Sequence, residues 1–416
     1  MNGRLLTKLI LATCFASFPG FAGSGFSQAA SQAAGLPVDS NVRGSANVHL
    51  RGDLGRLRKK LAGDAPVHVA FLGGSITQNT GGHTAMVPAW LRTQWPKTDL
   101  RFNNVGMGST CSTSGAFRHR SHVLAKGLDL LIVEFAVNDD QDAAHAYREC
   151  LRGMEGIIRR TRTQNPDAGI IMVHFVNPPM LAKIQNGKTP VSIAAHEAVA
   201  KHYGVTSVNV AAEVAESIKK GVYTWKDYGG THPKRFGYEI ASGLITGALD
   251  VHLKPSGQAI SKSNANLPLP LDTESYFGGE FVSVEKAQTS PGWKIGKATK
   301  DLMPMGGVRS QYFGYDALRA NAAGESLTLK FKGRALGAFI LAGPDAGIVE
   351  TRIDGGEWKR HNLYHRFSGG LNYPRSVMFH TDLKPADHRL ELRISGESDK
   401  RSKGNAATIL FFEVNE

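Results

Sequence analysis

The stretch AFLGGSITQN, residues 70–79, contains the end of an apolar run, Val67 to Leu72, that predicts a short buried strand. Gly73 and Gly74 follow the run directly, and Ser75 comes next. Two glycines after a strand indicate a sharp turn, or a backbone that must come close to another group. Two interpretations of Ser75 follow: a turn or helix-cap residue, or a nucleophile held at the end of a strand.

Strand-like and helix-like segments alternate from about residue 64 to residue 250. The apolar or β-branched runs that predict strands are 67–72, 100–105, 128–137, 169–176 and 204–210. Helical patterns lie between them, and the clearest, 147–166, has apolar residues on one face and ends at Asn165-Pro166. This alternation favours βαβ units and a parallel sheet covered on both faces. About five strands predict a flavodoxin-like three-layer α/β/α sandwich over residues 60–253.

A second pattern begins after residues 254–272, which are rich in Pro, Ser, Asn and Gly and therefore predict a linker. Short runs follow, several of which alternate apolar and polar residues. These runs are 326–333, 335–343, 348–356, 388–396 and 407–414. Turns such as Asp354-Gly355 separate them. We expect residues 273–416 to form an antiparallel β-sandwich of the jelly-roll type.

The first 29 residues differ from the rest of the chain. Two basic residues precede the apolar stretch LILATCFASFPGFAG, and small residues follow, which predicts a secretory signal peptide and a periplasmic or extracellular protein. A retained N-terminal anchor and a lipoprotein signal at Cys14 are the alternatives. Removal of the segment leaves Cys111 and Cys150, which either pair or stay free.

The chain is basic, with a formal net charge of +13, or 13 − 2 = +11 without the two basic residues of the predicted signal. Such a charge favours anionic surfaces or polysaccharides as partners, although a solvated basic surface is the simpler interpretation. The basic residues are scattered and form no nucleic-acid motif, so no nucleic-acid partner is expected. No apolar run reaches the roughly 18 residues of a membrane-spanning helix, so no stable membrane insertion is expected. The oligomeric state stays open.

Chemically capable residues follow the predicted strands. In a parallel α/β sheet, ligands gather at the carboxyl ends of the strands. Ser75 follows the first predicted strand, and the glycine loop NVGMGST, 104–110, follows the second. Asn138 comes just past the third, in VNDD (137–140), and His232 lies in WKDYGGTHPKRFGY, 225–238, beyond the last. These residues are therefore expected at one edge of the sheet.

Together the blocks FLGGSIT, NVGMGST, AVND and THPKRFGY resemble those of the SGNH hydrolase superfamily, the GDSL-type esterases, over roughly residues 65–250. Gly74 stands where that family often has Asp. The resemblance implies that Ser75 attacks an ester carbonyl, while His232 takes its proton and passes it to the leaving alcohol. It also implies an oxyanion hole made by the Ser75 N–H, a glycine N–H (Gly108 ahead of Gly106) and the Asn138 amide. No cofactor is implied.

The family usually places an Asp three residues before the His, and here that position is Gly229. The nearest carboxylate is Asp227, five residues before His232. Two models follow. Either the loop folds so that Asp227 orients the imidazole, or a backbone carbonyl or a water does so and Ser75 and His232 act as a dyad.

Four other residues are candidates for secondary roles. Arg118 follows the glycine loop and is a candidate for binding an anionic or hydroxyl-rich substrate, although a solvated arginine is the alternative. Trp225 and Tyr228, near His232, are candidates for stacking on a sugar ring. Glu134 interrupts an apolar strand, and a structural role is favoured over one facing the pocket. No Cys/His cluster has zinc spacing, so no metal is expected.

The C-terminal segment resembles the jelly-roll modules attached to SGNH-type carbohydrate esterases, in which a DG turn and a late H-x-L-x-L strand recur. These features correspond here to Asp354-Gly355 and to the strand that begins at His388. We therefore expect an exported esterase that removes acyl groups, O-acetyl above all, from a saccharide or polysaccharide. A lipase, thioesterase or acyltransferase using the same site is one alternative, and an inactive glycan-binding protein is another.

Overall fold

The computed structural model describes residues 46–254 and 267–416. The predicted signal peptide and most of the predicted linker lie outside these described residues. Within the described ranges, no helix is both long enough and apolar enough to cross a membrane.

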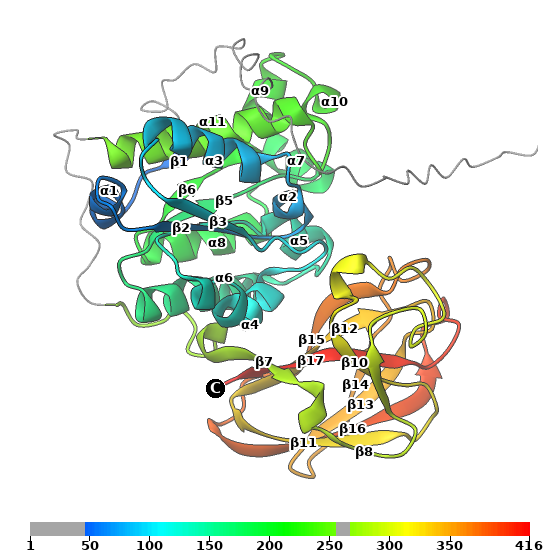
Figure 1. Ribbon diagram of the computed structural model, residues 1–416. Helices are drawn as coiled ribbons and strands as arrows, with labels where there is room; N and C mark the ends of the chain where they lie inside the picture. Colours follow the sequence, from blue (N-terminus) through cyan, green and yellow to red (C-terminus); the bar gives the residue numbers. More distant parts are fainter. Residues whose placement is uncertain (1–45, 255–266) are drawn as a thin grey trace, which may run out of the picture. The chain divides into compact units, whose positions relative to one another are not determined.

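The first described range builds one six-stranded sheet with the strand order β1-β6-β5-β4-β2-β3 (Figure 1). Its strands are β1 (Val48–His49), β2 (Val67–Leu72), β3 (Leu100–Asn104), β4 (Leu130–Val133), β5 (Gly169–Val173) and β6 (Thr206–Val208). All neighbours pair in parallel except β1, which runs antiparallel to β6. In chain order the five parallel strands are therefore arranged 2-1-3-4-5, which is the flavodoxin-like order. The predicted fold class is confirmed.

Helices cover both faces of this sheet, so its strands are buried on both sides (Figure 1). The helices are α1 (Gly55–Leu61), α2 (Ser75–Gln78), α3 (His83–Gln94), α4 (Ser112–His122), α5 (Ala136–Gln141), α6 (Tyr147–Gln164), α7 (Pro178–Gln185), α8 (Val191–His202), α9 (Val210–Lys219), α10 (Trp225–Tyr228) and α11 (Arg235–Leu253). Alternate residues of β2 show the two layers: Val69 and Phe71 pack with α1, α3 and α11, whereas Ala70 and Leu72 pack with α4, α6 and α8. This double burial explains why β4 and β5 are continuous apolar runs, whereas β3, at the edge of the sheet, is only partly buried.

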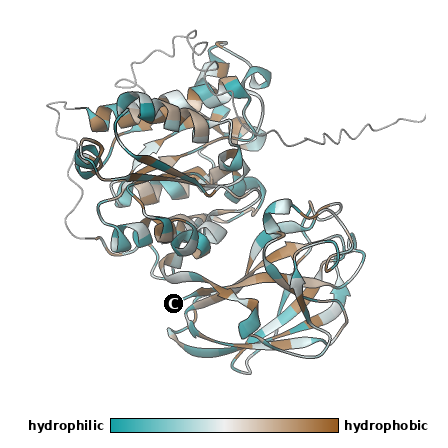
Figure 2. Cartoon of the chain, in the orientation of Figure 1, coloured by the Kyte–Doolittle hydropathy of each residue, from teal (hydrophilic) through white to brown (hydrophobic). Residues whose placement is uncertain are grey.

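The second described range is an antiparallel sandwich of two sheets, as predicted (Figure 1). Its strands are β7 (Gly279–Ser283), β8 (Gln288–Thr289), β9 (Lys294–Lys297), β10 (Asp316–Ala320), β11 (Ser326–Gly333), β12 (Ala335–Ala342), β13 (Gly347–Ile353), β14 (Lys359–Asn362), β15 (Tyr373–His380), β16 (Ala386–Ser398) and β17 (Ala407–Asn415). One sheet has the order β15-β12-β17-β10-β9 with β7 also on β17, and the other has the order β14-β13-β16-β11-β8. Apolar residues gather between them, as the hydropathy colouring shows (Figure 2).

The outer face of the β12–β17 sheet is also covered. Phe339 and Leu341 of β12 pack there with Met303 and Tyr312, which lie in the long connection between β9 and β10. The β9–β10 connection also supplies the side chains of Arg309 and Gln311, which contact the first domain.

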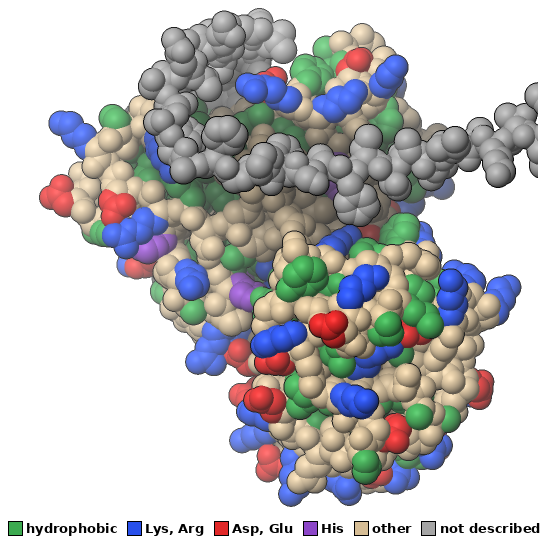
Figure 3. Space-filling view, turned by 45° about the vertical axis from the view of Figure 1, so that its right-hand side comes forward, with side chains coloured by type: hydrophobic (Ala, Val, Ile, Leu, Met, Phe, Trp, Pro, Cys, Tyr) green, Lys and Arg blue, Asp and Glu red, His purple; other side chains and the backbone are tan. Residues whose placement is uncertain are grey.

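Residues 271–276, which lead into the sandwich, contact α6 and α4 of the first domain. The buried carboxylate of Glu155 accepts hydrogen bonds from the backbone N–H groups of Leu271 and Asp272, at 2.6 and 3.0 Å. Tyr276 is fully buried and packs on Phe117 of α4, with ring centroids 5.1 Å apart. Residues 271–276 are therefore held by packing and hydrogen bonds. On the face seen in Figure 3, lysines and arginines are spread among acidic residues rather than gathered in one patch.

Candidate active site

The chain turns sharply from β2 into α2, and this turn carries Ser75. The turn lies between β3 and β4, where the direction of strand addition reverses, which is the usual ligand site of such sheets. A Cβ at Gly73 would lie 2.2 Å from Glu134 Oε1, and one at Gly74 would lie 2.1 Å from Asn138 Oδ1. Both glycines are thus required because two polar side chains pack directly against the loop.

Glu134 holds the turn between β2 and α2 through two hydrogen bonds. Its Oε1 accepts hydrogen bonds from the N–H of Gly74 at 2.9 Å and from the hydroxyl of Thr77 at 2.7 Å. Burial raises the pKa of this carboxyl to about 7, although the same hydrogen bonds lower it. The contacts agree with the structural role favoured for Glu134 from its sequence position.

Ser75 and His232 meet at the carboxyl end of β2. The Oγ of Ser75 lies 2.7 Å from Nε2 of His232, which belongs to the loop between α10 and α11. Ser75 is half-buried and His232 is exposed. In the tautomer that leaves Nε2 unprotonated, the hydroxyl donates to the ring and the ring can remove its proton. The nucleophile and the base are thus in hydrogen-bond contact.

Asp227 is not part of this contact. Its Oδ2 accepts hydrogen bonds from the N–H and the hydroxyl of Thr224, at 2.9 and 2.6 Å, so it forms the capping box of α10. These hydrogen bonds lower the pKa of Asp227. Among the described residues, no carboxylate is hydrogen-bonded to His232. The geometry therefore corrects the assignment of Asp227 as the third catalytic residue and favours the dyad model.

An aspartate at Gly229, the family position, would not fit this loop. Gly229 has φ +112°, which L residues with a side chain rarely adopt, and its Cβ would lie 2.2 Å from the backbone N of Lys234. The departure from the family pattern is therefore accompanied by a loop conformation that only glycine adopts easily.

The glycine loop presents one suitable N–H group to Ser75. The Gly108 N–H donates to the exposed side chain of Gln78 at 3.0 Å, and a Cβ on Gly108 would lie 3.6 Å from that of Ser75. The Gly106 N–H donates to Asn104 at 2.9 Å, and a Cβ on Gly106 would meet the backbone of Thr77 and Gln78 rather than Ser75. Gly108 is thus better placed than Gly106 for an oxyanion hole, once the Gln78 oxygen makes way for substrate.

Asn138 lies in the first turn of α5 and packs on Gly74. Its Nδ2 donates to Asp142 at 2.6 Å, and Asp142 also accepts a hydrogen bond from the hydroxyl of Tyr373 in β15 at 2.6 Å. The buried Oδ1 of Asn138 has no hydrogen-bond partner among the described residues and lies nearer to Gly74 than Nδ2 does. A role in the oxyanion hole therefore requires the second Nδ2 hydrogen to turn toward Ser75. Asp142 and Tyr373 thus fix the orientation of this amide, and neither was identified from the sequence.

Residues 71–240 match the model of the GDSL-like lipase/acylhydrolase family. The chain therefore contains an SGNH domain. Among solved structures, a two-domain esterase active on acetylated mannans, crystallised with mannopentaose, aligns with a TM-score of 0.71 and 21% identity. The alignment covers 89% of this chain and 97% of that one. A second structure of a two-domain esterase active on acetylated mannans gives the same TM-score and coverage at 22% identity. At this identity the match shows the shared two-domain fold. No curated protein matches the chain.

Two candidate substrate residues of the SGNH domain prove to be internal. Arg118 is fully buried, and its guanidinium donates to the carbonyl oxygens of Val105 and Gly73, at 2.6 and 3.1 Å. Tyr228 is also fully buried and stacks on Trp225 at 5.3 Å. Neither Arg118 nor Tyr228 can contact substrate, so both assignments are corrected. Trp225 is half-buried, and its role as a sugar contact stays a prediction.

The β-sandwich contributes side chains to the rim of the SGNH site. Arg309 donates to the carbonyl oxygen of Gly108 at 2.9 Å and to the hydroxyl of Ser109 at 3.0 Å. The side chain of Gln311 accepts a hydrogen bond from Gln78. Both belong to the β9–β10 connection, about 200 residues from the glycine loop. No sequence motif marks them, since their role depends on the tertiary contact.

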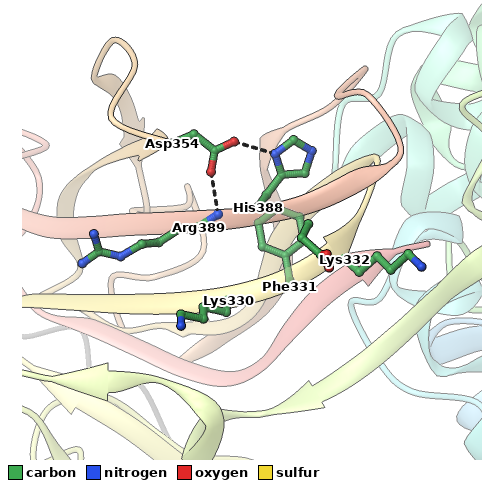
Figure 4. A pocket seen from close by; sticks show the side chains of 7 residues that line it. Lys330, Phe331, Lys332, Asp354, His388 and Arg389 are labelled. Carbon is green, nitrogen blue, oxygen red and sulfur yellow. Dashed lines mark hydrogen bonds and ion pairs between the residues drawn. The ribbon is translucent and has the colours of Figure 1, made fainter.

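A His–carboxylate pair lies in the sandwich near the start of β16, beside a pocket of about 480 Å³ (Figure 4). Asp354 accepts hydrogen bonds from Nδ1 of His388 and from the N–H of Arg389, both at 2.7 Å. The other nitrogen of His388 is 2.8 Å from the carbonyl oxygen of Lys384. The DG turn and the H-x-L-x-L strand singled out in the sequence therefore meet here. No hydroxyl or thiol side chain lines this pocket, so it has no serine, threonine or cysteine that His388 could activate.

Proposed function

We propose that this protein is an exported serine esterase that removes O-acetyl groups from a saccharide or polysaccharide. The observation that carries the proposal is the 2.7 Å contact between Ser75 Oγ and His232 Nε2 at the ligand-binding edge of an SGNH domain. The export part of the proposal rests on the sequence of residues 1–29, which lie outside the described residues.

The proposed reaction begins when Ser75 Oγ attacks the acetyl carbonyl and His232 accepts the hydroxyl proton. The oxyanion of the tetrahedral intermediate is stabilised by the N–H groups of Ser75 and Gly108 and by the Asn138 amide. Collapse expels the sugar hydroxyl, which takes the proton from His232. Water, activated by the same imidazole, then hydrolyses the acetyl-enzyme and releases acetate. No carboxylate is required to move a proton, so a dyad suffices for each step.

The choice of substrate rests on three observations. His232 is exposed, so a bulky leaving group such as a polysaccharide has access to it. Arg309 and Gln311 add polar side chains to the rim, which suits a hydroxyl-rich substrate. The solved structure with the same two-domain fold is an esterase active on acetylated mannans. The carbohydrate specificity proposed here is shared with that protein.

The direct test is release of acetate from acetylated mannan and acetylated xylan by the mature chain. Ser75→Ala is the matched control, because it removes one oxygen and leaves the fold intact. We expect acetate release by the wild type and none above background by the variant. Parallel assays with p-nitrophenyl acetate and p-nitrophenyl octanoate separate the alternatives. Cleavage of octanoate alone would indicate a lipase, and no cleavage of any ester would indicate an inactive glycan-binding protein.

A further inference from the structure

Three side chains with metal-binding atoms converge beside the oxyanion loop: Cys111, Asp139 and His145. Their ligand atoms all lie within 4.8 Å of one another, and Nδ1 of His145 is 3.8 Å from Oδ1 of Asp139. Ligands around one tetrahedral ion, at bond lengths of 2.0–2.3 Å, are about 3.5 Å apart. Small side-chain rotations would therefore bring all three atoms onto a single ion.

The cluster is inside the protein and has an unused donor. Cys111 and Asp139 are buried, and Nδ1 of His145 is buried without a hydrogen-bond partner among the described residues. A buried polar atom without a partner is uncommon in native proteins and calls for an explanation such as an ion or a water. In the tautomer of His145 that carries its proton on Nε2, Nδ1 has a lone pair available for an ion.

Asp139 has the support that is typical of a metal ligand. Its carboxylate accepts hydrogen bonds from the N–H and the hydroxyl of Ser112, at 2.8 and 2.7 Å. His196, fully buried in α8, lies 3.0 Å from the same carboxylate. Ligating side chains are commonly held by such outer hydrogen bonds, which fix their orientation. One carboxylate oxygen, Oδ1, has a single hydrogen bond and so keeps a lone pair for an ion.

A cavity next to the cluster leaves room for a further ligand. It measures about 360 Å³ and is lined by Cys111, His145, Asp142 and Glu149 among others. The half-buried Arg375 also lines it and carries a positive charge. A divalent ion bound by one thiolate, one carboxylate and a neutral imidazole forms a unit with no net charge, so the occupied site would not repel Arg375.

We propose that Cys111, Asp139 and His145 bind a divalent ion of the zinc type, with water from the cavity as the fourth ligand. Thiolate, imidazole and carboxylate together are the ligand set that zinc prefers, and hard ions such as Mg²⁺ avoid thiolate. Cys111 lies three residues after Gly108, and Asp139 directly follows Asn138. The ion would therefore brace the two segments that carry the oxyanion donors. The spacing in the sequence did not indicate this site, because the three ligands come from separate segments.

The test uses the full mature chain, reduced and stripped of metal with a chelator, and titrated with Co²⁺ as a spectroscopic probe. We expect one equivalent to bind and to produce a thiolate-to-cobalt charge-transfer band together with the visible bands of a tetrahedral site. Cys111→Ser should abolish the charge-transfer band, and His145→Asn should weaken binding about 100-fold or more. Cys150→Ser is the matched control, because it removes the other buried thiol and should leave the spectrum unchanged.

Zinc binding is then measured by competition with Co²⁺ and by its effect on the melting temperature. We expect Zn²⁺ to displace Co²⁺ and to raise the melting temperature of the wild type and of Cys150→Ser, but not that of His145→Asn. The proposal is overturned if no stoichiometric charge-transfer band appears, or if the band survives in Cys111→Ser. It is equally overturned if the protein purified without reductant contains a disulfide between Cys111 and Cys150.

Discussion

Each domain has a hydrogen-bonded histidine, His232 in the loop between α10 and α11 and His388 in β16, but the partners of the two rings differ. His388 in the sandwich has both ring nitrogens in hydrogen bonds, one to Asp354 and one to the carbonyl oxygen of Lys384. His232 in the SGNH domain has a single hydrogen bond, to Ser75, and no carboxylate partner among the described residues. Under the proposed mechanism, contact with a nucleophile identifies the catalytic base better than a carboxylate partner does.

The two hydrogen-bond patterns suit two different roles, one structural and one in proton transfer. A ring with two fixed partners connects β-strands and gains stability from the pair. A ring with one partner hydroxyl and one free nitrogen can accept a proton and pass it on, since nothing else competes for Nε2. We expect His232 to transfer protons and His388 to stabilise the sandwich, and variants of the two residues test this difference.

The largest effect is expected at the Ser75–His232 pair. Ser75→Ala and His232→Ala should each lower kcat/KM for p-nitrophenyl acetate by at least about 10³-fold, because they remove the nucleophile or its base. The double variant should be no worse than either single one, since the two act as a unit. His388→Ala is the control and should change kcat/KM by less than about twofold. A loss of kcat/KM in His388→Ala as large as that in His232→Ala would contradict the different roles assigned to the two histidines.

A smaller effect is expected at the oxyanion hole. Asn138→Ala should lower kcat by about 10²-fold with little change in KM, because the amide acts on charge that develops only in the transition state. Asn209→Ala is a matched control, since Asn209 only caps α9 and should affect stability alone. A loss in KM with unchanged kcat would instead place Asn138 in ground-state binding.

Asp227→Asn should lower kcat by less than about tenfold, because Asp227 caps α10 rather than orienting His232. Its visible effect should be a lower melting temperature, in line with a cap worth about 1 kcal/mol. Thr224→Ala breaks the same cap from the other side and should match it in both measurements. A several-hundred-fold loss of kcat in Asp227→Asn alone would restore the triad model.

The smallest effect is expected at the sandwich pair and depends on pH. Burial lowers the pKa of His388, but its hydrogen bonds to Asp354 and to the Lys384 carbonyl and the charge of Asp354 outweigh this effect, so the pKa is raised in the folded protein. The stabilisation is therefore fully present below the unfolded pKa of about 6.5 and is lost as pH rises through the folded pKa. Asp354→Asn should lower the melting temperature at about pH 5 and have less effect at about pH 9. An effect that grows with pH would contradict the assignment.

Much of the fold is encoded locally and could be predicted. The continuous apolar runs of the parallel strands and the alternating runs of β11 and β16 mark burial on two faces or on one. The run 128–137 was predicted as one strand, but β4 ends at Val133 and α5 starts at Ala136. The apolar residues beyond Val133 are buried in a turn and a helix, which periodicity alone does not distinguish from a strand.

The candidate site likewise contains residues that the sequence indicates and residues that it does not indicate. Ser75, Gly108, Asn138 and His232 lie in short motifs at predictable chain positions, so the sequence indicated them. Arg118 was misplaced because nothing local shows that its guanidinium points inward to two carbonyl groups. Tyr373 and Arg309 were missed because their contacts with the SGNH domain join residues about 200 or more positions apart.

Covalent labelling with a fluorophosphonate, mapped by mass spectrometry, tests the central claim most directly. The reagent reacts only with a serine that a neighbouring base has activated. We predict a single adduct on Ser75 in the wild type, undiminished labelling in His388→Ala and Asp227→Asn, and no adduct in Ser75→Ala or His232→Ala. An adduct on another residue, or a wild type that stays unlabelled while still hydrolysing p-nitrophenyl acetate, would contradict the account.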